Sequence, residues 1–74
     1  MRLTVKLFAY FRDKRFTEKV AEYPEGSTVA DIIRSLEIEL SEVGVTMLNS
    51  RHCGLNQVPA EGDQLAIFPA IGGG

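Results

Sequence analysis

The sequence predicts one α+β domain in which a single helix covers one face of a mixed sheet. Three observations carry this prediction. Residues 2–8 alternate as a half-buried strand does, and residues 64–70 form a second strand-like apolar run. Between them, residues 29–37 repeat apolar side chains at helical spacing. The expected order along the chain is two strands, one helix and then two or three strands.

The first two strands are expected to form a hairpin. Residues 2–8 divide into two faces, one with Leu3, Val5 and Leu7 and the other with Thr4, Lys6 and Phe8. Residues 16–23 have the composition of a strand but alternate imperfectly, because Phe16 and Val20 share a face with two glutamates. We expect this segment to pair with the first strand through a loop at residues 9–15.

The helix has start signals of its own. Pro24 and Gly26 end the second strand. Thr28 and Asp31 form a capping box in which Asp replaces the more usual Glu or Gln. The apolar stripe that follows consists of Val29, Ile32, Ile33 and Leu36. We therefore expect a helix over residues 29–37.

The segment after the helix returns to the sheet. Residues 45–49 predict a short strand. Residues 51–63 are rich in turn formers, and a short edge strand is expected near residues 55–58. An acidic-glycine turn at residues 61–63 then leads into the last strand at residues 64–70.

Size and composition limit the function classes. The chain has 74 residues, 45% of them hydrophobic and 24% charged, which fits one globular domain with a single core. Its net charge of -2 is too small to indicate a nucleic-acid or membrane partner, and no apolar run approaches the roughly 20 residues of a membrane span. The single cysteine, Cys53, allows neither an internal disulfide nor a thiolate metal site. We expect a cytoplasmic protein with one domain at residues 1–70 and a flexible glycine tail at residues 71–74.

Two local motifs suggest other chemistry. His52 and Cys53 are adjacent, but a nucleophile–base pair needs hydrogen-bond geometry and an orienting third group. We expect an exposed loop histidine beside a half-buried cysteine. The run "FRDKRF" at residues 11–16 has three positive charges, yet an acidic residue interrupts it. A solvated hairpin loop is therefore a better interpretation than nucleic-acid binding.

Three stretches together resemble the MoaD/ThiS family of ubiquitin-like sulfur carriers: "LFAYFRDKR", "EYPEGSTVADII" and "EGDQLAIFPAIGGG". The resemblance covers essentially the whole chain, and its most specific part is the ending. The early "FAYFRD" and the Phe68–Pro69 pair favour the small subunit of molybdopterin synthase. Three departures leave the pathway open: Ala70 where a second proline is common, Ser50 where glycine is common, and a third terminal glycine at Gly72.

The resemblance implies the β-grasp fold, with four to five strands, one main helix on one face, and the first and last strands parallel at the sheet centre. Combined with the alternation, this order turns Phe8 and Phe68 away from the helix and places them side by side. A paired aromatic patch of this kind is a usual interface anchor. The alternative is that neighbouring loops fold over the two rings.

The resemblance also implies the chemistry of the chain end. A glycine thread can enter a narrow active site on another protein, but its carboxylate needs a better leaving group before it can react. An E1-like adenylating enzyme would use ATP to adenylate Gly74, and a persulfide sulfur donor would displace AMP to give a thiocarboxylate. The acceptor would be a pterin precursor held by a large synthase subunit.

In that scheme the chain is a covalent cosubstrate, or the small subunit of a synthase-like sulfurtransferase, and not an enzyme by itself. It binds no cofactor or metal, since the ATP belongs to the activating partner. Gly73 and Gly74 carry the reaction. The residues implied to contact partners are Phe8, Arg12, His52, Phe68, Pro69, Ile71 and Gly72.

Other functions stay open at this point. The sulfur could pass to thiamine thiazole, to cysteine synthesis or to another acceptor enzyme. A ubiquitin-like modifier joined to a target lysine would use the same activated Gly74. A plain protein-binding module would use the sheet edge and the aromatic patch alone.

Overall fold

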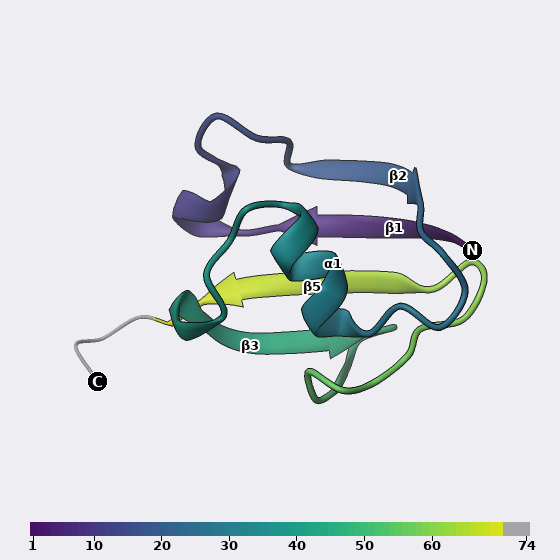
Figure 1. Cartoon of the computed structure of the whole chain (residues 1–74). Helices are drawn as coiled ribbons and strands as arrows, with labels where there is room; N and C mark the ends of the chain where they lie inside the picture. Colours follow the sequence, from purple (N-terminus) through teal and green to yellow (C-terminus); the bar gives the residue numbers. More distant parts are fainter. Residues whose placement is uncertain (71–74) are drawn as a thin grey trace.

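The structure of the protein is a computed structural model that describes residues 1–70. A five-stranded sheet of order β2-β1-β5-β3-β4 carries one α-helix across a single face (Figure 1). The elements in chain order are β1 (Arg2–Leu7), η1 (Ala9–Arg12), β2 (Glu18–Glu22), α1 (Val29–Ser35), η2 (Leu40–Glu42), β3 (Val43–Leu48), β4 (Arg51–His52) and β5 (Gln64–Pro69). This confirms the predicted α+β class and the mixed sheet with one main helix.

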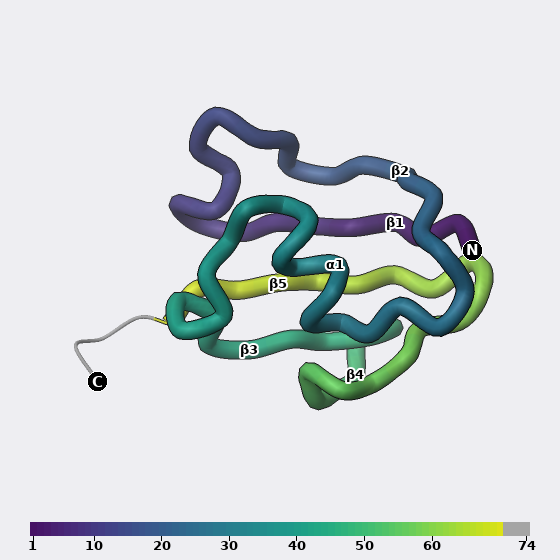
Figure 2. The backbone as a smooth tube through the Cα atoms, in the orientation of Figure 1, coloured from purple at the N-terminus to yellow at the C-terminus, as the bar shows by residue number. Residues whose placement is uncertain are grey.

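The centre of the sheet is the parallel pair of β1 and β5, in which Val5 lies opposite Leu65 and Leu7 opposite Ile67. On the outer sides, β2 pairs antiparallel with β1, and β3 pairs antiparallel with β5. The hairpin of β1 and β2 and the parallel central pair are therefore confirmed. Together they make the β-grasp arrangement, in which the last strand lies inside the sheet and not at its edge (Figure 2).

The core lies between this sheet and α1. The strands contribute alternate side chains and the helix contributes three residues of its predicted apolar stripe, all at most 1% exposed: Leu3, Val5, Leu7, Val29, Ile32, Ile33, Leu65 and Ile67. The fourth predicted residue, Leu36, is the C-cap of α1 and is partly buried. Phe11 from η1 closes one end of the core at 1% exposure. Burial of each such side chain contributes about 1.5–3 kcal/mol, which is how so short a chain folds without a disulfide.

The start of α1 is capped as predicted. The Thr28 hydroxyl accepts a hydrogen bond from the Asp31 amide at 3.1 Å, and the Asp31 carboxylate accepts one from the Thr28 amide at 3.0 Å. Two further amides at this end, those of Val29 and Ala30, donate to backbone carbonyls in the segment at residues 55–57. The Val29 and Ala30 amides would have no partner within the helix itself, so the later segment completes the cap.

The end of α1 lies at Ser35, two residues before the predicted limit. Glu37 adopts a φ of 61°, and its amide donates to the Arg34 carbonyl at 2.9 Å. The next amide, that of Ile38, returns to the Ile33 carbonyl at 3.4 Å. This pair of bonds is a Schellman motif, and the left-handed residue at its centre stops the helix.

The prediction of a short edge strand near residues 55–58 is wrong. The edge strand is β4 at Arg51–His52, because Asn49 and Ser50 form a two-residue hairpin loop with φ values of 52° and 69°. Positive φ at both loop positions is typical of a type I′ turn, which reverses the chain at once. Residues 55–57 instead cap the start of α1, because the carbonyls of Leu55 and Gln57 accept hydrogen bonds from helix amides at 2.9 Å.

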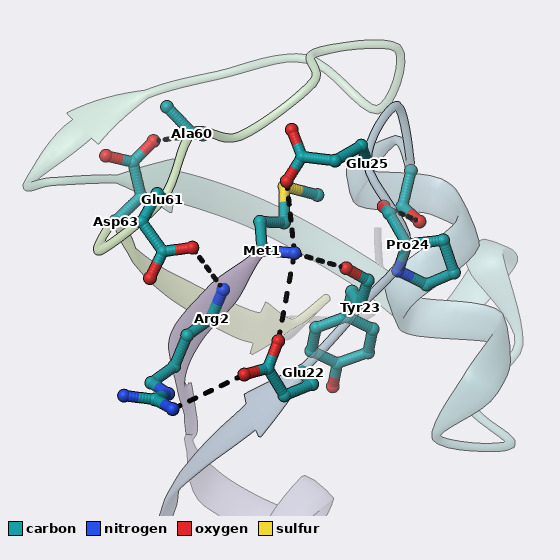
Figure 3. A network of polar contacts seen from close by, with 10 residues as sticks. Met1, Arg2, Glu22, Tyr23, Pro24, Glu25, Ala60, Glu61 and Asp63 are labelled. Atoms are coloured by element: carbon teal, nitrogen blue, oxygen red, sulfur yellow. Dashed lines mark hydrogen bonds and ion pairs between the residues drawn. The ribbon is translucent and has the colours of Figure 1, made fainter.

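A polar network closes the sheet at the start of β1 (Figure 3). The Met1 amino group donates to the Tyr23 carbonyl at 2.6 Å and lies 3.1 Å from the Glu25 carboxylate. The Arg2 amide donates to the Glu61 carboxylate at 2.9 Å. These contacts join β1 to the end of β2 and to the loop before β5. They lie at the end of the sheet opposite to the end of β5 (Figure 1).

Candidate functional site

Phe8 and Phe68 lie side by side on the face of the sheet that α1 leaves uncovered. The parallel register pairs Leu7 with Ile67, and Phe8 continues the extended backbone of β1 with φ -127° and ψ 155°. The two rings stack with their centroids 4.1 Å apart and an interplanar angle of 15°. Both side chains remain half-buried. The predicted pairing of the two phenylalanines is confirmed.

Arg12 adds a third layer to this pair. Its guanidinium carbon lies 5.3 Å from the centroid of the Phe8 ring, within cation–π distance. The Arg12 Nε donates to the Leu7 carbonyl at 2.8 Å, which holds the side chain in place. We call Arg12, Phe8 and Phe68 the aromatic stack. The loop after β1 thus covers part of the aromatic pair, but it does so with an exposed, positively charged side chain.

The apolar surface continues from the aromatic stack onto β3. Val45 lies opposite Phe68, and Met47 lies opposite Ala66, so their side chains share the helix-free face. Val45 is 37% exposed. Sequence reasoning missed both β3 residues, although the alternation of β3 would have indicated them once its register with β5 was known. We call this surface, with the aromatic stack, the docking face.

His52 lies on the same face but outside the aromatic stack. It pairs with Met47 on the edge strand β4, and its side chain is exposed. Cys53 follows on the other face, where its thiol lies 3.6 Å from the Thr46 hydroxyl and is half-buried. Thr46 in turn donates to the Cys53 carbonyl at 2.8 Å. The exposed histidine and half-buried cysteine are as expected, but His52 belongs to a strand and not to a loop.

Neither residue forms a nucleophile–base pair with the other, because adjacent strand residues point to opposite faces. Both line a groove along the outer edge of β3, together with Val43, Gly44, Val45, Thr46, Gly54 and Leu55. Within residues 1–70, no group of three His, Cys, Asp or Glu side chains is arranged to hold a metal ion. In the same part of the chain, no helix combines the length and apolarity needed to cross a bilayer.

The end of β5 is fixed to the start of β3. Pro69 is buried and lies opposite Val43, so it anchors the strand and is not part of the exposed docking face. The Ala70 amide donates to the Glu42 carbonyl at 2.8 Å. The remaining predicted residues, Ile71, Gly72, Gly73 and Gly74, lie outside the described residues.

Both arginines in the positive run at residues 11–16 make contacts within the fold. Arg12 belongs to the aromatic stack, and Arg15 donates to the carbonyls of Leu36, Glu37 and Phe11 at 3.1, 3.2 and 3.3 Å. Arg15 therefore caps the end of α1 and ties it to η1. These contacts give no indication of a nucleic-acid surface. The loop that was expected to be solvated instead contains η1 and buries Phe11.

Two carboxylates, those of Asp63 and Asp31, have a pKa below the usual value. The pKa of Asp63 is lowered by the hydrogen bond from the Ala60 amide, at 2.8 Å, and by a second from the Asn49 side chain, at 2.9 Å. The pKa of Asp31 is lowered by its bonds with Thr28 in the capping box. Asp63 belongs to the turn before β5 and Asp31 to the cap of α1, so their role is structural.

Comparison with known proteins agrees with this geometry. The ThiS family model matches residues 5–74 of the chain. No curated protein matched. A Pyrococcus furiosus protein assigned as molybdopterin converting factor, subunit 1, is 25% identical over 96% of this chain and 99% of its own, with a TM-score of 0.78.

Two further solved structures share the fold. The H. volcanii small archaeal modifier protein 1 is 22% identical over 95% of this chain and 98% of its own, with a TM-score of 0.76. In a Helicobacter pylori complex of subunits 1 and 2 of molybdopterin-converting factor, the matching chain is 17% identical, with full coverage of both chains and a TM-score of 0.67. The family match spans nearly the whole chain, and the neighbours share its β-grasp fold. The chain therefore belongs to the ThiS family of ubiquitin-like sulfur carriers.

Proposed function

We propose that the protein is a sulfur carrier for molybdopterin synthesis, activated at the carboxylate of Gly74. The observation that supports this most directly is the position of the chain end. The last described residue, Ala70, lies two residues after Phe68, so the working terminus begins beside the docking face. A partner that binds the aromatic stack therefore contacts a residue, Phe68, that is only six positions from the carboxyl-terminal Gly74.

The chemistry needs three steps, each with a group supplied by a partner. A carboxylate oxygen of Gly74 attacks the α-phosphorus of ATP, and pyrophosphate leaves to give an acyl-adenylate. The terminal sulfur of a persulfide then attacks the acyl carbon, and AMP leaves to give an acyl disulfide. A thiol cleaves that disulfide, which leaves the thiocarboxylate on Gly74 and forms a new disulfide with the donor. The role of this chain is to present the acyl group.

The proposed partners follow from this scheme. An E1-like enzyme binds ATP and adenylates Gly74, and a persulfide donor supplies sulfur. A large synthase subunit takes the sulfur, by analogy with the second subunit in the Helicobacter pylori complex. Cytoplasmic location is part of the same proposal, because ATP and persulfide donors must reach the chain end.

The experiment is intact-protein mass spectrometry after incubation with ATP, an E1-like enzyme and a persulfide source. The expected result is the mass increase for one oxygen replaced by sulfur, located at Gly74 by fragmentation. A variant that ends at Ile71 is the control, since it should fold but gain no mass. An unchanged mass of the full chain, with an activating enzyme that works on its own carrier, would contradict the proposal.

A ubiquitin-like modifier is the second candidate, because the fold also matches the small archaeal modifier protein. It shares the adenylation step but transfers the acyl group to a lysine amine, which forms an amide and releases the activating group. The same experiment separates the two functions. A conjugate with a lysine-linked Gly74 and no thiocarboxylate would favour the modifier.

A further inference from the structure

The pairing of β3 with β5 contains one irregularity, and it lies beside the chain end. Val43 lies opposite Pro69 and Val45 opposite Phe68, so two steps along β3 match one step along β5. Gly44 is the extra residue. An insertion of this kind is a β-bulge, which bends its strand and commonly redirects a neighbouring group.

The bulge brings Gly44 into contact with the backbone of the last described residues. A Cβ on Gly44 would lie 2.7 Å from the Ala70 Cα, 2.9 Å from the Ala70 nitrogen and 2.9 Å from the Pro69 carbonyl oxygen. Carbon atoms in contact prefer separations of about 3.5–4.0 Å. All three neighbours are backbone atoms, so no side-chain rotation can relieve the overlap. Any larger residue at this position must displace Ala70.

A hydrogen bond holds Ala70 from the same side. Its amide donates to the Glu42 carbonyl at 2.8 Å, and Glu42 ends η2 immediately before β3. Ala70 is therefore seated between the end of η2 and the bulge. The neighbouring residues of β3, Val43 and Val45, instead pair with Pro69 and with Phe68 of the docking face.

We infer that Gly44 is a positioning residue for the activated carboxyl terminus, an inference that rests on the proposed function. Gly74 is four residues beyond Ala70, and so few residues can span at most about 14 Å. When the partner is bound at the aromatic stack, the position of Ala70 therefore limits where the Gly74 carboxylate can lie in the partner's active site. A misplacement of about 1 Å in a reacting group can cost on the order of a hundredfold in rate.

The test compares Gly44→Ala with a matched control, Gly54→Ala. A Cβ on Gly54 meets no atom within 4 Å, so the control makes the same chemical change in open space. The first measurement is amide hydrogen exchange at Ala70, which reports the seat without any partner. The second is the rate of adenylation by an E1-like enzyme, with KM and kcat determined separately.

We expect Gly44→Ala to speed exchange at Ala70 by about tenfold or more, because the bond to Glu42 is displaced. Exchange at the buried strand residues Val5 and Ile67 should stay slow. For adenylation, kcat should fall by about tenfold or more while KM stays within about twofold, because the docking face is unchanged. Gly54→Ala should match the wild type in both measurements.

Three results would overturn the inference: unchanged exchange at Ala70 in Gly44→Ala, unchanged kcat, or loss of cooperative unfolding. The last would make Gly44 a residue that the sheet needs for folding. Failure of the wild-type chain to be adenylated would instead contradict the proposed function. The exchange comparison would still show whether Gly44 seats Ala70.

Discussion

The Phe8 ring stacks on the Phe68 ring at a centroid separation of 4.1 Å, and this contact joins the end of β1 to the end of β5. Stacked aromatic pairs contribute about 0.5–1.5 kcal/mol beyond the burial of their surface. The pair therefore supports the end of β5 and, at the same time, leaves part of an apolar surface exposed. Stability and docking should respond differently when each ring is removed.

Phe68→Ala is expected to weaken binding of the activating enzyme by about tenfold or more, because buried aromatic anchors dominate interface energies. The folded state should survive, since Phe68 lies outside the core cluster. Isothermal titration calorimetry measures the affinity. Val20→Ala is the control, as Val20 is 58% exposed on β2, away from the aromatic stack. Equal affinities for the two variants would contradict a docking role for the stack.

Ser50→Gly is expected to raise the free energy of unfolding by about 0.5–1 kcal/mol, because Ser50 holds a φ of 69° that glycine adopts without strain. Urea unfolding measures the change. Ser35→Gly provides a contrast of opposite sign, since Ser35 is the last residue of α1 and glycine lowers helix stability. A loss of stability in Ser50→Gly would mean that the serine side chain supports the turn.

Arg15→Ala is expected to lower the free energy of unfolding by about 1–2 kcal/mol. It leaves the carbonyls of Leu36 and Glu37 without the donor that caps the end of α1. Arg34→Ala is the matched control, because within residues 1–70 the Arg34 side chain makes only an exposed pair with Asp31 at 3.5 Å, which should be worth less than about 0.5 kcal/mol. Similar losses in both variants would show that charge, and not capping, matters.

Stability is expected to fall in acid, and Asp63 should account for part of the loss. Its folded pKa is lowered, so its contribution is complete above the unfolded pKa of about 3.9 and disappears as pH falls through the folded value. Asn49→Ala removes the second cause of the shift and should move the Asp63 pKa upward. NMR titration of the Asp63 carboxyl carbon measures this. An unmoved pKa would leave the Ala60 amide as the only cause that matters.

Local patterns predicted the parts of the fold that depend on neighbouring residues. Alternation in β1 and β5 identified the buried faces, and Thr28 with Asp31 identified the helix start. Alternation together with the parallel order of the family fold then placed Phe8 beside Phe68. Each of these depends on spacing within a few residues or on one topological fact.

Contacts between distant residues could not be predicted in this way. Arg15 caps a helix that ends 20 residues later in the chain. The carbonyls of Leu55 and Gln57 accept hydrogen bonds from amides near residue 30. Without that contact in view, the apolar residues at 55–58 resembled a strand. Gly44 carried no signal in the sequence and lay outside the strand expected at residues 45–49. Gly44 must lack a side chain because Ala70 lies against it, and only the folded sheet brings these two residues together.

The parallel neighbourhood of β1 and β5 has a mechanical consequence. The start of β1 and the end of β5 lie at opposite ends of the sheet (Figure 2). The two strands pair in parallel from Thr4 opposite Gln64 to Leu7 opposite Ile67, and a ladder of hydrogen bonds joins them. A force that pulls the carboxyl end away from the amino end loads this ladder in shear, so its bonds resist together and do not open one at a time. If a partner draws the chain end into its active site, as proposed, the pull acts along the direction in which this strand pair resists best.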